Sequence, residues 1–122
     1  REQNESADFS GLLAEVTDKR KVLRLLLESC EKDMTDLKIA MTTEKVESMR
    51  NVVHRMMPMW EMLSMENTLL AYRKALKEQD NDIQALLVHT GQIITHIERL
   101  MDDARKEIEI IADEETDTDS RG

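Results

Sequence analysis

Apolar residues recur every three or four positions along most of the chain, which is the spacing of helices that bury one face. A short helix is predicted after Asp8, an N-cap candidate, and a long second helix after Thr17 or Asp18. The side chains expected to be buried by these two helices are Phe9, Leu12, Leu13 and Val16, followed by Leu23, Leu26, Leu27, Cys30, Met34, Leu37 and Met41.

Thr42 and Thr43 separate the second helix from a third, in which the apolar repeat approaches a strict heptad. A fourth helix follows Ser64, and the polar turn 79–82 precedes the last helix. The side chains expected to be buried are Val46, Met49, Val53, Met56, Trp60 and Leu63 in the third helix, Leu69, Tyr72 and Leu76 in the fourth, and Ile83, Leu86, Leu87, Thr90, Ile93, Ile94, Ile97, Leu100, Met101, Ala104 and Ile108 in the last.

Long apolar stripes joined by short links predict an all-α fold, an up-down four-helix bundle with a short extra N-terminal helix. The bundle is expected over residues 8–112, between a flexible N-terminal segment at 1–7 and an acidic disordered tail at 113–122. An extended coiled coil is the alternative, but the short links favour helices that fold back on one another. Since only 2% of the residues are aromatic and only three are glycine, folds that contain sheets are nearly excluded.

The composition also limits the functions that the chain could have. With 26 acidic and 17 basic residues the net charge is −9, which argues against nucleic acid as a partner. Three glycines cannot form a P-loop or a G-x-G-x-x-G loop, so nothing supports nucleotide binding. No apolar stretch approaches the ~20 residues of a membrane span. The single cysteine, Cys30, fits a reducing compartment and is expected in the core, and the start at Arg1 suggests a fragment of a larger polypeptide.

One histidine lies where a helix would present it to solvent. His54 follows the core position Val53 and is therefore expected at the margin of the buried stripe. An ordinary histidine pKa of about 6.5 leaves an exposed imidazole with a free lone pair near neutral pH, which makes it a competent nucleophile. Pro58 comes four residues later, and its missing N–H would have bonded the His54 carbonyl. Either this proline marks a site, or the helix ends or bends there to follow the bundle, with His54 an ordinary polar surface residue.

The segment VVHRMMPMWEMLSMENTL, residues 52–69, resembles the active-site helix of histidine phosphotransfer (HPt) domains. In that family an apolar residue precedes the phosphorylated histidine, and an apolar residue, a lysine and a glycine follow it at two, three and four positions. Val53, His54 and Met56 match, whereas Met57 replaces the lysine, Pro58 the first glycine and Ser64 a further glycine. The variant is similar to that of HPt domains in Bacteroidetes hybrid two-component sensor kinases. Residues 23–41 resemble the helix that precedes the histidine, and the resemblance covers about Phe9 to Ile111.

The resemblance implies a phosphorelay intermediate that carries a phosphoryl group and is not itself an enzyme. His54 would accept the group from a receiver-domain aspartate and pass it to another receiver, with response-regulator receiver domains as the partners. The carrier would need no ATP and no cofactor, because Mg²⁺ is expected only in the receiver. We expect a monomer that binds no nucleic acid and does not insert into a membrane. A cytoplasmic location is expected, either free or as the cytoplasmic part of a membrane-anchored sensor.

The residues around the histidine are expected to form the contact surface for a receiver. Because Met57 replaces the family's lysine, another cation is expected beside the phosphoryl group. Lys77 is a candidate because, allowing one inserted residue after Ser64, it falls where the family often has a polar residue on the adjacent helix. The full set of expected phosphoryl-stabilising and docking residues is Arg50, Arg55, Met57, Pro58, Glu61 and Lys77, with Asn51 beside them.

Two other functions remain open. One is the dimerisation and phosphoacceptor hairpin of a histidine kinase, whose motif H-[ED]-x-x-x-P has an acidic residue where Arg55 stands and its proline one residue later than Pro58. The other is a non-catalytic helical interaction module in which His54 is incidental. The methionines between Met49 and Met65 suit either a partner-binding surface or packing against the first helix or a second subunit.

His89 and His96 are seven residues apart on the last predicted helix. Metal-binding histidines on a helix are normally four apart, or come as Glu-x-x-His pairs in di-iron bundles. Neither pattern occurs here, so both histidines are interpreted as polar residues of the scaffold. No metal site is predicted.

Overall fold

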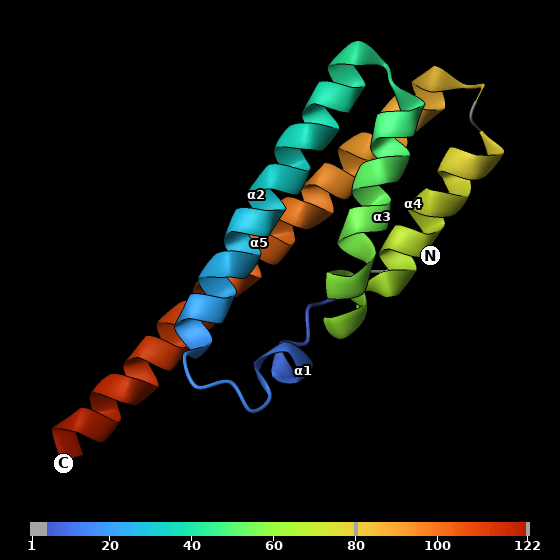
Figure 1. The fold of residues 1–122 in the computed structure, drawn as a ribbon. Helices are drawn as coiled ribbons and strands as arrows, with labels where there is room; N and C mark the ends of the chain where they lie inside the picture. Colours follow the sequence, from blue (N-terminus) through green and yellow to red (C-terminus); the bar gives the residue numbers. More distant parts are fainter. Residues whose placement is uncertain (1–4, 80, 122) are drawn as a thin grey trace.

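The structure, a computed structural model, describes residues 5–79 and 81–121, and the side chains of these residues up to 116. Every regular element in this part of the chain is a helix, and four of the five are long. This confirms the predicted all-α fold with a short extra N-terminal helix (Figure 1). The helices are α1 (Ser10–Leu13), α2 (Lys19–Thr43), α3 (Val46–Met62), α4 (Glu66–Glu78) and α5 (Ile83–Arg121).

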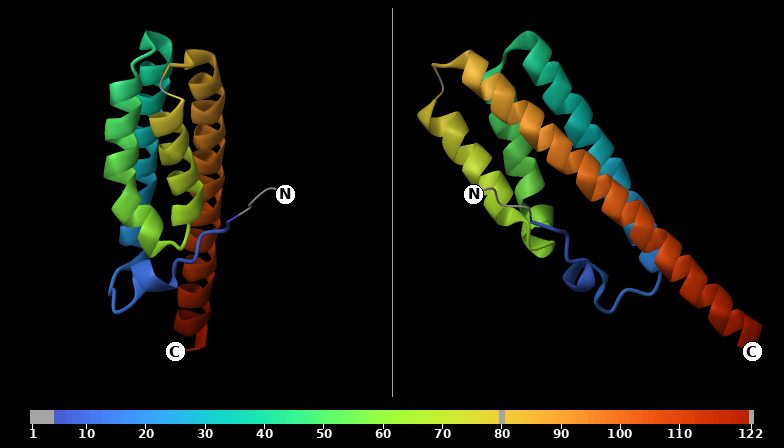
Figure 2. Two further views of the ribbon diagram at one scale, coloured as in Figure 1. Left: turned by 90° about the vertical axis from the view of Figure 1, so that its right-hand side faces the viewer. Right: turned by 180° about the vertical axis from the view of Figure 1, so that it is seen from behind.

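The long helices form an up-down bundle in which each helix runs opposite to the one before it (Figures 1 and 2). α2 packs against α3 and α5, and α4 packs against the same two helices from the other side. α1 lies below the turn that joins α3 to α4. Among the helices that the structure describes, none combines the length and apolar character that crossing a membrane requires.

The helix ends follow the predicted polar signals at two of the links. The Asp18 carboxylate accepts a hydrogen bond from the Lys21 backbone at 3.1 Å, and the Asp82 carboxylate accepts one from Ala85 at 3.1 Å. These side chains satisfy backbone N–H groups that have no partner within the helix. α1 is shorter than predicted, because it ends at Leu13 and does not include Val16.

The core contains most of the predicted stripes but is shifted by one residue in the second half of α2. Asp33 and Ala40 are buried there, whereas the predicted Met34 and Met41 are only partly buried. The heptad residues of α3 from Met49 onward are buried as predicted, and Trp60 is fully enclosed. Since an acidic side chain lies inside the bundle, it must have a charged partner, and that partner is part of the site described below.

Described residues continue beyond the predicted bundle 8–112 at both ends. α5 extends as a helix to Arg121 and so enters the predicted tail 113–122, where Glu115 pairs with Arg20 of α2 at 2.8 Å, just after Ile111 packs in the interior. Of the predicted flexible segment 1–7, residues 1–4 lie outside the described residues, as do residues 80 and 122. Residues 5–9, which we call the N-terminal strap, are tied to the bundle. The strap's first carboxylate, Glu5, accepts hydrogen bonds from the backbone and hydroxyl of Thr68, at 2.9 and 2.7 Å.

Candidate functional site

His54 lies on the solvent-exposed face of α3, in agreement with its predicted place at the margin of the buried stripe. Core residues precede and follow it along the helix: Val53 and Met56 are each 1% exposed. Since both of these side chains are buried, the imidazole between them is directed away from the interior. The ring is therefore accessible to a reacting group carried by another molecule.

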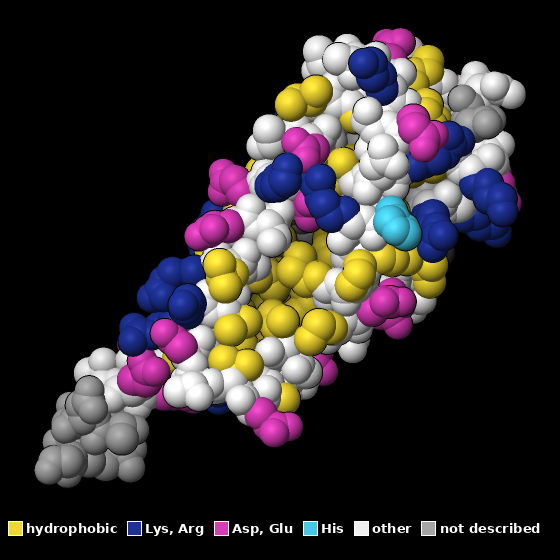
Figure 3. Space-filling model, viewed as in Figure 1, with side chains coloured by type: hydrophobic (Ala, Val, Ile, Leu, Met, Phe, Trp, Pro, Cys, Tyr) yellow, Lys and Arg dark blue, Asp and Glu magenta, His cyan; other side chains and the backbone are white. Residues whose placement is uncertain are grey.

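A cleft of about 340 Å³ opens beside His54, between α3 and α4. Three of its lining residues are basic and none is acidic. Lys and Arg side chains gather over α3 and α4 on this face of the molecule (Figure 3). The positive charge favours an anion at this place, although the chain as a whole carries a net charge of −9. The lining residues are Arg50, Asn51, Val53 and His54 from α3, and Arg73, Leu76 and Lys77 from α4.

Arg50 braces the cleft rather than standing free in it. One of its terminal nitrogens donates to Glu47 at 3.2 Å, and the other donates to the Leu76 backbone carbonyl at 3.1 Å. Carbonyls in the last turn of a helix have no partner within that helix. Arg50 donates a hydrogen bond to such a carbonyl at the end of α4 and thereby connects α4 to α3. Of the predicted cations, Arg50 and Lys77 do line the cleft with His54.

Arg73 was not among the predicted site residues. It precedes Lys77 by one helical turn, so both side chains lie on the same face of α4 and line the cleft together. Among the described residues, neither cation has an ion-pair partner. The spacing of four residues was the available signal in the sequence. These two side chains are the cations best placed to receive an anion near His54.

A buried polar contact with α5 fixes the rotation of α4 about its own axis. The Tyr72 and Thr90 hydroxyls are 2.5 Å apart, and Thr90 donates to the Leu86 carbonyl at 2.7 Å. Burial raises the pKa of Tyr72 to about 12, so the phenol stays protonated and can donate to Thr90. Because Tyr72 points into α5, the adjacent Arg73 is turned away from α5 and toward α3.

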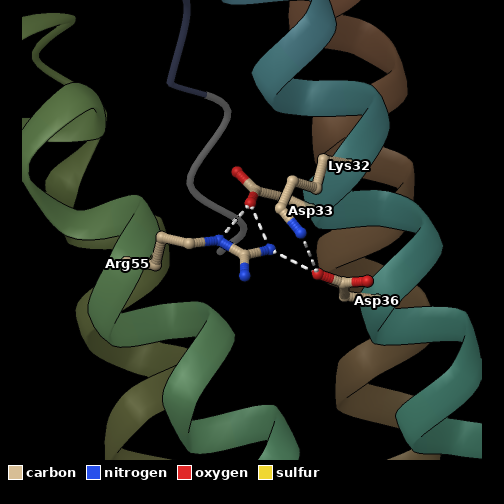
Figure 4. Close-up of polar contacts among 4 residues, drawn as sticks. All are labelled: Lys32, Asp33, Asp36 and Arg55. Carbon is tan, nitrogen blue, oxygen red and sulfur yellow. Dashed lines mark hydrogen bonds and ion pairs between the residues drawn. The ribbon is translucent and has the colours of Figure 1, made fainter.

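Arg55 lies outside the cleft and is bound to α2. Its Nε donates to Asp33 Oδ1 at 2.9 Å, and its Nη2 lies 2.7 Å from the same oxygen and 2.8 Å from Asp36 Oδ2 (Figure 4). Lys32 joins the group through Asp36 at 3.3 Å. We call Lys32, Asp33, Asp36 and Arg55 the α2–α3 ion cluster. Burial raises the pKa of Asp33, whereas the hydrogen bond from Arg55 holds the pKa of Asp36 below its usual range.

Arg55 was also expected to stabilise a phosphoryl group on His54, and in this structure its side chain is instead engaged by Asp33 and Asp36. The Asp33 side chain is 7% exposed and the Arg55 side chain 41%, so withdrawing Arg55 would leave a buried carboxylate without its cation, a loss of up to about 3–5 kcal/mol for a fully buried pair. A solvent-exposed ion pair gains only about 0–1 kcal/mol. A phosphoryl group on His54 would therefore not draw Arg55 away from α2.

The remaining predicted docking residues continue along α3 beyond the cleft. Met57 is partly buried against the core, and Pro58 and Glu61 are exposed. None of the three lines the cleft. α3 does not end at the proline but continues to Met62, so the carbonyl of His54 lies opposite a backbone nitrogen that carries no hydrogen.

The other singled-out residues lie elsewhere. His89 and His96 border a separate hollow of about 300 Å³ between α4 and α5. In the part of the chain that the structure describes, no group of three or more His, Cys, Asp and Glu could hold a metal ion. Cys30 is a core residue as predicted, 1% exposed, and burial raises the pKa of its thiol to about 12. The thiol is therefore not a reactive one.

Comparison of the chain with protein-family models, with curated proteins and with solved structures finds no match. The class of molecule that fold and site define is thus a helical bundle with an exposed histidine beside a basic cleft. What this arrangement can do chemically follows from its own geometry. A nucleophilic ring and neighbouring cations suit the transfer of an anionic group.

Proposed function

We propose that the chain is a phosphoryl carrier, in which His54 accepts a phosphoryl group from a receiver-domain aspartate and returns it to another receiver. The observation that carries this proposal is the exposed imidazole at the edge of a cleft with Arg73 and Lys77 on its far wall. The resemblance of residues 52–69 to HPt domains supports it independently. The architecture supports it as well, because a single chain forms the whole bundle, whereas the kinase hairpin needs only two helices per chain.

The transfer requires little from this chain beyond a positioned nucleophile. The neutral imidazole attacks phosphorus through its unprotonated nitrogen, and the electron pair of the breaking P–O bond passes to the aspartate as a carboxylate. Arg73 and Lys77 neutralise the charge of the group while it resides on His54. Metal-assisted stabilisation of the transition state belongs to the receiver. The return transfer runs through the same bonds in reverse.

The experiment is incubation of the purified chain with phosphorylated receiver domains, with acid lability of the acquired label as the signature of phosphohistidine. We expect label on the wild type and none on a folded His54→Gln variant. His89→Gln and His96→Gln are the matched controls and should retain it, because both histidines lie away from the cleft. Acid-labile label on His54→Gln would refute the assignment. Binding of a partner without any label on the wild type would favour the interaction module instead.

A second experiment tests the cations that line the cleft. Replacing Arg73 and Lys77 together by glutamine should slow acceptance by about 10-fold or more, since each cation is aimed at the charge that the reaction places on His54. Arg99→Gln on the exposed face of α5 removes the same kind of charge away from the site and should leave the rate unchanged. Incubation with ATP and Mg²⁺ alone should give no label, and label from ATP would contradict a carrier role.

A further inference from the structure

The α2–α3 ion cluster buries a charge at a place where an apolar residue would suffice for packing. Among the described residues, Asp33 is the one charged side chain in the interior. A buried ion pair is weak evidence for stability, because the cost of desolvation offsets most of the attraction. Its better attested use is to specify one relative placement of the elements that it joins. The cluster joins α2 to α3 at the residue that follows His54.

Adjacent residues on a helix differ by about 100° around its axis. Drawing Arg55 onto Asp33 therefore fixes the direction in which His54 leaves α3. On the other flank, Arg50 is anchored to the Leu76 carbonyl of α4 at 3.1 Å. His54 lies between these two anchors, so α3 is held against rotation in both directions. The planar guanidinium of Arg55 contacts two carboxylates, which makes this anchor directional in a way that apolar packing is not.

We propose that Asp33 is a positioning residue for His54: by holding Arg55 on α2, it turns the imidazole toward the cleft lined by Arg73 and Lys77. This deepens the proposed function and rests on it. The cluster also removes Arg55 from competition for the transferred group, because its charge is already matched by Asp33 and Asp36. The phosphoryl group is therefore received on the α4 side of His54 and not on the α2 side.

The test is a double-mutant cycle on the rate of transfer from a phosphorylated receiver. One change is Asp33→Asn, which keeps the shape of the side chain and removes its charge. The other is the joint replacement Arg73→Gln and Lys77→Gln. If Asp33 aims His54 at these cations, their removal slows transfer about 10-fold with Asp33 present but less than about twofold with Asp33→Asn. A merely structural role gives independent, multiplying losses, and that result would overturn the proposal.

One chemical probe and two further variants serve as controls for this cycle. Carbethoxylation of His54 by diethyl pyrocarbonate needs only an exposed ring, so its rate should change by less than about twofold in a folded Asp33→Asn variant. Arg55→Lys keeps the charge but loses the fork, and it replaces Asp33→Asn in the cycle if that variant does not melt cooperatively. Asp102→Asn removes the carboxylate of an exposed pair on α5 and should leave transfer unchanged.

If the wild type accepts no label from any receiver, the proposed function itself fails. If the wild type accepts label and Asp33→Asn accepts it equally fast, the positioning role alone fails.

Discussion

The carboxyl of Asp33 is where burial and pairing oppose each other most directly. Burial raises its pKa above the ordinary 3.8, because the loss of hydration outweighs the attraction of Arg55. The folded protein therefore binds this proton more readily than the unfolded chain does. The stability that this group contributes is fully present below about pH 3.8 and is lost as the pH rises through the raised pKa.

Asp33→Asn removes this titrating group, so comparing it with the wild type shows whether the group's contribution to stability rises or falls with pH. We expect the free energy of unfolding of the wild type, relative to the variant, to fall as the pH rises from about 3.8 and then to level off once the pH lies above the raised pKa. Urea unfolding of both proteins across this range measures the difference. A relative stability that grows with pH would mean that the pairing with Arg55 outweighs burial.

Single residues also mark where reasoning from the sequence succeeds and where it stops. The exposed position of His54 follows from the apolar spacing of its own helix, which is local information. The burial of Asp33 could not be predicted in this way, since an acidic residue at a core position becomes acceptable only when a cation from another helix lies opposite it. For the same reason the pairing of Arg55 with α2 could not be predicted from the spacing within α3.

At the scale of one element, α3 tolerates a proline well inside its length. Pro58 lacks the N–H that would bond the His54 carbonyl, and its ring crowds that carbonyl. Pro58→Ala should restore the hydrogen bond and raise the free energy of unfolding by about 1–3 kcal/mol. Thermal or urea unfolding measures it, with Glu61→Ala on the exposed face of the same helix as the control. An unchanged or lower stability would mean that the bundle depends on the proline.

The start of α4 depends on a residue far away in the sequence. Its N-cap residue, Met65, has no side chain that can accept a hydrogen bond, and Glu5 of the N-terminal strap supplies the acceptor to Thr68 instead. Glu5→Ala should cost about 1 kcal/mol of stability and speed hydrogen exchange at the Thr68 amide. Glu5→Gln keeps an acceptor oxygen and should lose much less. Equal exchange in all three proteins would show that the strap does not cap α4.

The elements themselves were largely predictable because helix spacing, caps and turn residues all act over a few positions. The order of four long helices, the buried face of α3 and the cap at Asp82 follow from such local signals. The cap from Glu5 and the extension of α5 do not, because both depend on contacts between distant segments. No cleft was predicted from the sequence, although Arg50 and Lys77, which line it, were expected near His54; Arg73 was found only with α4 in place.

For the molecule as a whole, the last part of α5 adds length beyond the other helices (Figure 2). Past Ile111 its side chains are mostly exposed up to residue 116, and one of its ties to the bundle is the exposed pair of Arg20 and Glu115. Deleting residues 113–122 should therefore lower the free energy of unfolding by no more than about 1 kcal/mol. Circular dichroism should show a loss of helix with little change in melting temperature. A large drop in melting temperature would mean that this segment stabilises the fold.

The strap that caps α4 also has a consequence for how the chain folds. Glu5 and Thr68 are 63 residues apart, so their contact closes a loop that includes α2 and α3. Closing so long a loop costs more chain entropy than forming any turn between neighbouring helices, and contacts of this kind form late. The opening turn of α4 should therefore gain its cap only when the N-terminal strap has docked. The same turn should open again whenever the strap detaches, because its cap comes from Glu5 and not from α4 itself.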